Sequence, residues 1–294
     1  MMAKVWLHPY GIERDYTNAL VKATRQFNKE INSAYGDIRF DGWQDDMSAV
    51  LAYLRNAGNR IFQPVIERLQ TFFALTSQFN DKQWRLIVKG GTGYDIPPSQ
   101  AVIAGQTTVP VSSGVLGVDA YRAEPWLREM QELWVSENAR LIKSIPSDEL
   151  ADMEVIIQRG VMNGSSADTI KKQIQERYGV TERRAELIAV DQIGKANSAL
   201  SRQRQEDAGV KYYIWRGVRD ERERQSHLAL EGCYFRLDGR PMTDADLEAC
   251  GVPNQRYRHP TESDSQASAP GAPVRCRCYR GPVWIGSVFD IGGE

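Results

Sequence analysis

The sequence contains few cysteines and histidines and no long apolar run. Its four cysteines in 294 residues are too few for a disulfide scaffold, so we expect a reducing compartment. No window approaches the roughly 18 uninterrupted apolar residues that a membrane helix needs. The N-terminus also lacks the apolar segment of a signal peptide. These absences favour a soluble protein that is made in a cytoplasm.

An excess of charge of one sign is also missing. The formal net charge is −1, and 41% hydrophobic and 26% charged residues are ordinary for a soluble globular protein. Residues 201–280 contain 14 Lys and Arg against 12 Asp and Glu, so even this arginine-rich part is nearly balanced. The balance argues against a protein whose main task is to coat nucleic acid. The length allows one large domain or two ordinary ones.

Helix periodicity dominates the first two thirds of the chain. Between residues 44 and 80, apolar side chains recur every three or four positions, which is typical of an amphipathic helix. The helical pattern is expected to break at Gly90-Gly91-Thr92-Gly93, at Pro146 and at Gly179. Helices are therefore predicted over residues 12–35, 44–80, 124–144, 148–162, 165–179 and 182–207.

Two other parts of the chain have a different character. Residues 101–123 are rich in Val, Thr, Ser and Gly, which indicates an extended arm or an insertion. After Gly209, aromatic and β-branched residues predict strands near residues 211–216, 234–239 and 283–285. Residues 251–275 carry four prolines and are expected to form a long loop.

These patterns predict an α+β protein. A mainly helical N-terminal body is followed by a small C-terminal α+β module with a long Pro/Gly/Ser-rich loop. We divide the chain into a helical N-terminal region (1–100), the arm or insertion (101–123) and a final domain (124–294). In that final domain, helices occupy residues 124–209 and the α+β module occupies residues 210–294.

A dense run of charge from Asp220 to Gly232 contains one of the three histidines, and two cysteines follow near the C-terminus. Candidate metal ligands are His227, Cys233, Cys276 and Cys278. Zinc accepts such a mixture of ligands, although Cys-x-Cys is tighter than the usual spacing. A Cys-His nucleophilic pair is the second alternative, but no glycine-framed nucleophile segment accompanies it. The third alternative, small buried cysteines beside a hydrogen-bonded histidine, is favoured over structural zinc.

The other residues of this run have structural interpretations. Asp220 could form a bidentate clamp with Arg222 or Arg224, or the run could be a solvated face. Trp215 is most simply a core residue. The structural motif comprises Trp215, Asp220, Arg222, Arg224, His227 and Gly232. Arginines that could contact DNA phosphates non-specifically are Arg256, Arg258, Arg275, Arg277 and Arg280. No complete catalytic constellation is present, so we assign no catalytic residue and expect a protein that is not an enzyme.

From about Arg140 onward the chain resembles the phage Mu F-like minor head protein family, also called the phage head morphogenesis family. The matching pieces occur in order along the sequence. They are Leu141 to Pro146, two capped helices, the helix from Arg184 to Ala189, Gly209-Val210, Trp215, the run from Asp220 to Gly232, and Pro270 to Cys278. The resemblance covers roughly half of the chain, and it would make residues 124–294 a Mu F-like head morphogenesis domain.

The resemblance implies a minor structural protein of a tailed-phage or prophage head. Such a protein would lie inside the capsid near the portal and act in head assembly, with genome packaging or ejection as a further role. Its expected partners are the portal protein, the major capsid or scaffold proteins, and packaged DNA without sequence preference. Neither a membrane nor a small-molecule substrate is expected. The alternative is a small hydrolase or transferase built on the C-terminal module, with His227 and Asp220 as acid and base.

Overall fold

The computed structural model describes residues 6–35, 43–99, 124–251 and 269–287. The predicted arm at 101–123 lies outside these ranges. So do Arg256, Arg258 and most of the predicted loop at 251–275. Within the described ranges, no helix is both long and apolar enough to cross a membrane.

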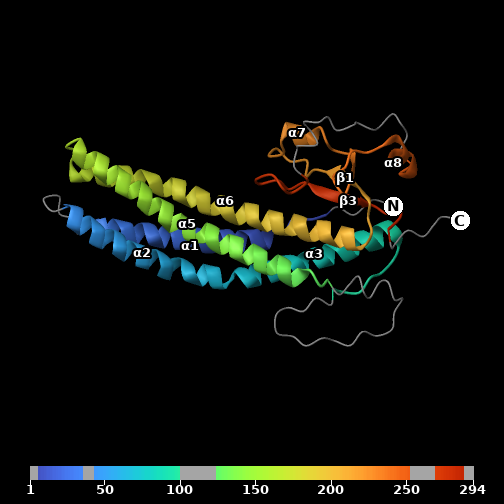
Figure 1. Ribbon diagram of the computed structural model, residues 1–294, viewed down its shortest axis with the longest axis horizontal. Helices are drawn as coiled ribbons and strands as arrows, with labels where there is room; N and C mark the ends of the chain where they lie inside the picture. The colour runs from blue at the N-terminus through green and yellow to red at the C-terminus, as the bar shows by residue number, and fades with distance from the viewer. Residues whose placement is uncertain (1–5, 36–42, 100–123, 252–268, 288–294) are drawn as a thin grey trace. The chain divides into compact units, whose positions relative to one another are not determined.

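The described elements are mostly helices, with a small sheet near the C-terminus (Figure 1). The helices are α1 (Tyr10–Tyr35), α2 (Trp43–Glu67), α3 (Leu69–Thr92), α5 (Leu127–Met162), α6 (Ala167–Asp207), α7 (Gln225–Leu228) and α8 (Asp244–Ala249). The strands are β1 (Tyr212–Arg216), β2 (Tyr234–Arg236) and β3 (Tyr279–Val283), in the antiparallel order β2-β1-β3. The predicted fold class, a helical body followed by a small α+β module, is confirmed.

Two predicted helix breaks are wrong, because α5 continues through Pro146 and α6 continues through Gly179. A proline inside a helix costs about 3 kcal/mol, and a glycine costs about 1 kcal/mol relative to alanine. Pro146 is buried and packs closely on α2, since a Cβ added at Gly58 would lie 2.9 Å from Cβ of Pro146. Burial of apolar surface at such contacts offsets the local cost of the proline.

Two further predictions of element boundaries are corrected. The predicted helix over 44–80 is divided at Arg68 into α2 and α3. Helix α3 ends at Thr92, within the break predicted from Gly90 to Gly93, and the indole of Trp284 occupies the space that a side chain at Gly91 would need. The last strand is Tyr279–Val283 instead of 283–285, because these residues pair with the whole length of β1.

The chain separates into two compact units, which differ from the division predicted at residue 124. The helical unit comprises Tyr10–Phe73 and Gln131–Gln192, and the sheet unit comprises Met1–Pro9, Ala74–Met130 and Ile193–Glu294. Each unit therefore takes residues from both sides of that position.

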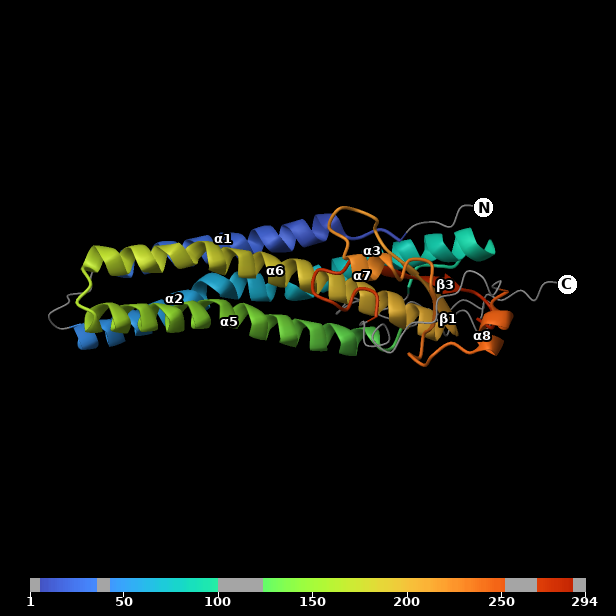
Figure 2. The same cartoon turned by 90° about the horizontal axis from the view of Figure 1, so that it is seen from above.

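The helical unit has an aromatic core. In Figures 1 and 2, α1, α2, α5 and the first part of α6 run side by side. Tyr16 and Phe73 are buried, and each ring packs against the ring of Trp134. The hydroxyl of Tyr16 donates to Oδ1 of Asn138, and Nδ2 of Asn138 donates to Oε1 of Gln192. These polar side chains, Tyr16, Asn138 and Gln192, are thus paired with one another within the unit, as most buried polar groups are.

The sheet unit is built on a core that draws on distant parts of the sequence. Its buried residues are Trp6, Trp84, Ile87, Val88, Ile96, Ala208, Val210, Tyr213 and Leu237, with Phe235, Tyr279 and Trp284 packed against them. They come from the N-terminal segment, from the second half of α3 and the residues after it, from the connection between α6 and β1, and from the sheet and the residues next to its strands. The C-terminal module is therefore completed by residues from the N-terminal third of the chain.

Candidate functional site

The candidate site lies where the segment after β1 meets the segment that leads into β3. Glycine is required at the turn before β2, because Gly232 has a φ of +80°. The N–H of Gly232 donates to the carbonyl of Trp215 at 2.9 Å, and the N–H of Trp215 donates to the carbonyl of Cys233 at 2.9 Å. These bonds return the chain to the sheet and fix the short helix α7 beside it.

Three of the four predicted metal ligands come together at this place. His227 of α7 is 6% exposed, and Cys276 and Cys278 are 7% and 6% exposed. Nδ1 of His227 lies 3.6 Å from Sγ of Cys276 and 3.4 Å from Sγ of Cys278. Residues two apart on an extended segment face the same way, so the Cys-x-Cys spacing directs both sulfurs to the same histidine.

The fourth predicted ligand, Cys233, is not part of this group. Its thiol donates to the carbonyl of Ala229 at 3.9 Å, and its backbone is held by Trp215. Among the residues that the structure describes, the group of closely spaced metal-ligating side chains consists of His227, Cys276 and Cys278.

The two clustered thiols have very different affinities for protons. A hydrogen bond from Cys278 lowers the pKa of the Cys276 thiol to about 6, although burial opposes this, and the N–H of Gly271 also donates to its sulfur at 3.4 Å. The same thiol-thiol hydrogen bond and burial raise the pKa of Cys278 above its ordinary value.

An ion pair joins the same two segments. Nη1 and Nη2 of Arg277 donate to the two carboxylate oxygens of Asp220 at 2.6 and 2.7 Å. This bidentate bond, together with the N–H of Arg222, holds the pKa of Asp220 below its usual value even though desolvation opposes the shift. The clamp predicted at Asp220 thus exists, but its partner is Arg277. Arg222 is largely exposed and approaches Asp220 only to 3.5 Å.

Further contacts secure the cluster. Nη2 of Arg224 donates to the carbonyl of Val274 at 2.7 Å. Glu223, which the sequence did not single out, accepts from the N–H of Arg219 at 2.6 Å, and its Oε1 lies 3.6 Å from Sγ of Cys278. Arg219 has a positive φ of 58°, which is uncommon for a residue other than glycine.

A small apolar core packs against the cluster of His227, Cys276 and Cys278. Trp215 is 1% exposed and packs with Leu230, Cys276 and Cys278. The ring of Trp215 also meets the ring of His227 edge-on, with centroids 5.5 Å apart. Water is therefore largely kept away from the histidine and the two sulfurs.

Two of the arginines proposed for contact with DNA have other roles in the structure. Arg277 is held by Asp220, and Arg280 is buried, with Nη1 donating to Oγ of Ser198 at 3.0 Å. Burial lowers the pKa of Arg280 below its ordinary value. Arg275, the third described member of that set, is exposed on the surface.

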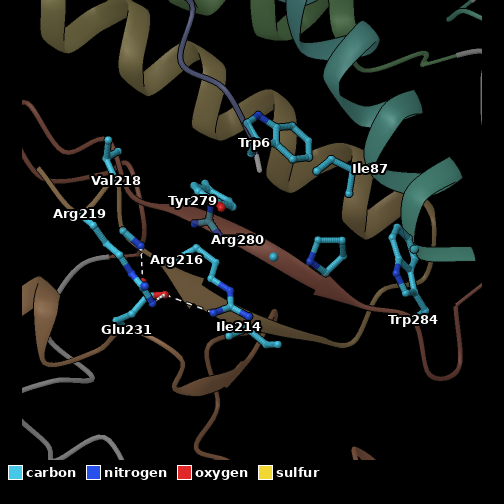
Figure 3. Close-up of a pocket in the computed structure, with 14 residues that line it drawn as sticks. Trp6, Ile87, Ile214, Arg216, Val218, Arg219, Glu231, Tyr279, Arg280 and Trp284 are labelled. Atoms are coloured by element: carbon cyan, nitrogen blue, oxygen red, sulfur yellow. Dashed lines mark hydrogen bonds and ion pairs between the residues drawn. The ribbon is translucent and has the colours of Figure 1, made fainter. Parts of the chain in front are cut away.

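A separate pocket of about 530 Å³ lies in the sheet unit. Figure 3 shows Trp6, Ile87 and Trp284 on its apolar side, and Arg216 and Arg219 directed toward Glu231. The side chain of Glu231 accepts from Arg216 at 3.2 Å and from Arg219 at 2.9 Å.

Three of the charged side chains that line this pocket, Arg216, Arg219 and Glu231, are paired with one another. Burial raises the pKa of the Glu231 carboxyl, but hydrogen bonds from the N–H of Gly217 and from the two arginines outweigh it and lower the pKa overall. Asp220 and His227 are not among the residues that line the pocket. The acid and base of the alternative hydrolase or transferase therefore do not line this pocket.

The fold is that of a mainly helical protein with a small three-stranded sheet near its C-terminus. In the site, the segment after β1 and the segment before β3 are joined by the Arg277-Asp220 pair and by the cluster of His227, Cys276 and Cys278. Residues 151–280 match the family described as "Phage Mu protein F like protein". This segment, a little under half of the chain, is similar to that family, and the resemblance predicted from the sequence is confirmed.

A relative from Haemophilus influenzae, described as "Uncharacterized protein", is 32% identical to this chain over 170 residues. The alignment covers 57% of this chain and 33% of the relative, so the shared part is about a third of the relative's length. No solved structure matches the chain.

Proposed function

We propose that this chain is a minor structural protein of a tailed-phage or prophage head and acts in head morphogenesis. The observation that carries the proposal is the match of residues 151–280 to the Phage Mu protein F like family. The proposed location is the capsid interior near the portal, with the portal protein and the major capsid or scaffold proteins as partners. Packaged DNA would be a non-specific contact through phosphates.

The geometry at Asp220 and His227 supports a structural role over acid-base catalysis. A general base must be able to reach a proton on a bound substrate. Both oxygens of Asp220 are held by Arg277, and the Nδ1 atom of His227 faces two buried sulfurs. Asp220 and His227 are therefore each occupied by a partner within the protein, as expected of residues that maintain the fold.

Protein analysis of purified particles tests the location. Mass spectrometry of virions and of procapsids is expected to find this chain at a low copy number relative to the major capsid protein. Its absence from both kinds of particle would contradict the proposal.

Point variants test the structural role. Asp220→Ala and His227→Ala should each destabilise the sheet unit, and for the buried His227 the loss should be about 1–3 kcal/mol, as for other buried polar groups whose partners are left unsatisfied. Both variants should enter heads less efficiently and reduce the yield of infectious particles. Arg222→Ala, in the same run but with a side chain 76% exposed, is the matched control and should behave as the wild type. Stable, fully incorporated Asp220→Ala and His227→Ala proteins in non-infectious particles would instead favour catalysis.

A further inference from the structure

The His227 cluster has the dimensions of a tetrahedral metal site. With Zn–S bonds of about 2.3 Å and Zn–N bonds of about 2.0 Å, a tetrahedral angle places the nitrogen and sulfur ligands about 3.5 Å apart. The separations between Nδ1 of His227 and the sulfurs of Cys276 and Cys278 are 3.6 and 3.4 Å. The three ligand atoms all lie within 4.8 Å of one another and form a group that could hold one ion.

Hydrogen bonding alone accounts less well for this arrangement. A ring nitrogen carries either one proton or one lone pair, so Nδ1 of His227 can make one good hydrogen bond to a thiol. Here two sulfurs approach the same nitrogen in a buried environment. A cation bound between the three atoms would satisfy all of them at once.

The surrounding contacts hold the ligands in place before any ion binds. The Asp220-Arg277 pair and the bond from Arg224 to Val274 join the loop that carries α7 to the segment that carries both cysteines. Such outer contacts orient the ligands and are a regular feature of metal sites. Two thiolates and an imidazole favour zinc over hard cations such as Mg²⁺ or Ca²⁺.

We propose that His227, Cys276 and Cys278 bind one Zn²⁺ ion that ties the α7 loop to the start of β3. Glu223 lies beside the cluster, where its Oε1 accepts from Sγ of Cys278 at 3.6 Å. Because the ligands are buried and are joined to structural contacts, the ion stabilises the fold. The inference does not depend on the proposed role in phage heads.

Cobalt binding to the full-length chain tests the proposal. Metal is first removed with a chelator under reducing conditions, and Co²⁺ is then added in steps. We expect a thiolate-to-cobalt charge-transfer band and the visible bands of tetrahedral Co²⁺, both saturating at about one equivalent for a single site. Zn²⁺ should abolish both, because it binds such a site more tightly than Co²⁺. A titration without a charge-transfer band would overturn the proposal.

Cysteine variants assign the ligands. Cys276→Ser and Cys278→Ser should each lose the charge-transfer band or halve its intensity, whereas Cys233→Ser and Cys250→Ser should keep it. Zinc should raise the melting temperature of the wild type and of the two controls, since an ion that binds only the folded state stabilises it. Loss of the band in Cys233→Ser, or an unchanged band in Cys276→Ser and Cys278→Ser, would refute the assignment. If either ligand variant fails to fold, the band of the wild type, which requires thiolate ligands, still decides whether the site exists.

Discussion

The buried ion pair between Arg204 and Glu124 allows a quantitative test of how the sheet unit is stabilised. Both side chains are 1% exposed, and Nε and Nη2 of Arg204 donate to the carboxylate at 2.7 and 3.0 Å. The other N–H groups donate to Ser77 and to Oδ1 of Asn80. All five donors of a guanidinium are therefore used. Glu124→Gln keeps the shape of the side chain but removes the charge that offsets the buried cation.

The expected cost follows from these contacts. Losing one hydrogen bond to a charged group costs about 1.5–3 kcal/mol, and the cation that is left behind raises the total to about 3–5 kcal/mol. Hydrogen exchange of the β1 amides measures this loss, because these amides report on the sheet unit. Unfolding by urea, followed by circular dichroism, provides an independent measure.

A double variant separates charge from packing. Glu124→Leu combined with Arg204→Met removes both charges and keeps apolar volume, so it should be at least about 2 kcal/mol more stable than Glu124→Gln. The reasoning fails if Glu124→Gln lies within about 0.5 kcal/mol of the wild type, the range of ordinary surface substitutions. It also fails if the double variant is the less stable of the two.

Three further predictions concern single contacts. Thr243→Ala removes the hydroxyl of the capping box of α8 and should cost about 1 kcal/mol in urea denaturation, while Thr243→Ser should retain the cap. In Gly160→Ala the new methyl would lie 2.4 Å from Cγ1 of Ile170, so we expect a net loss of about 1–2 kcal/mol from overpacking, partly recovered by adding Ile170→Val. The hydrogen bond from Arg236 lowers the pKa of Asp238 to about 2, and an unfolded aspartate titrates near pH 4. Its contribution to stability is therefore complete above about pH 4 and is lost as the pH falls toward 2. Urea midpoints in that window should fall less for Asp238→Asn than for the wild type.

The sequence predicted the helical body and the small sheet because their apolar periods differ. It failed at Pro146 and Gly179, where local propensity argues for a break. Propensity is a weak guide when tertiary contacts intervene: Pro146 packs on Gly58 of α2, which no local rule can anticipate. The same holds for Gly91, whose missing side chain makes room for Trp284 almost two hundred positions later in the chain.

The site was predictable in composition but not in pairing. The charged run suggested a clamp at Asp220 with a near neighbour, whereas the partner is Arg277, 57 residues away. The sequence did contain a signal for this pairing. Successive side chains of an extended segment point to opposite sides, so Arg277 must point away from the side that Cys276 and Cys278 share. No comparable signal existed for Glu223, whose position beside Cys278 depends on how the two loops meet.

The core of the sheet unit indicates that the segment shared with the family does not bury its apolar face by itself. Residues 151–280 contain β1, β2 and the start of β3, yet Trp6 and Trp84 lie in the same buried cluster as Tyr213 of β1. An exposed apolar face of this kind would be costly in water. The matched segment therefore relies on apolar residues from outside its own bounds. A relative that shares only this segment must cover the same face with other parts of its chain, or with a partner.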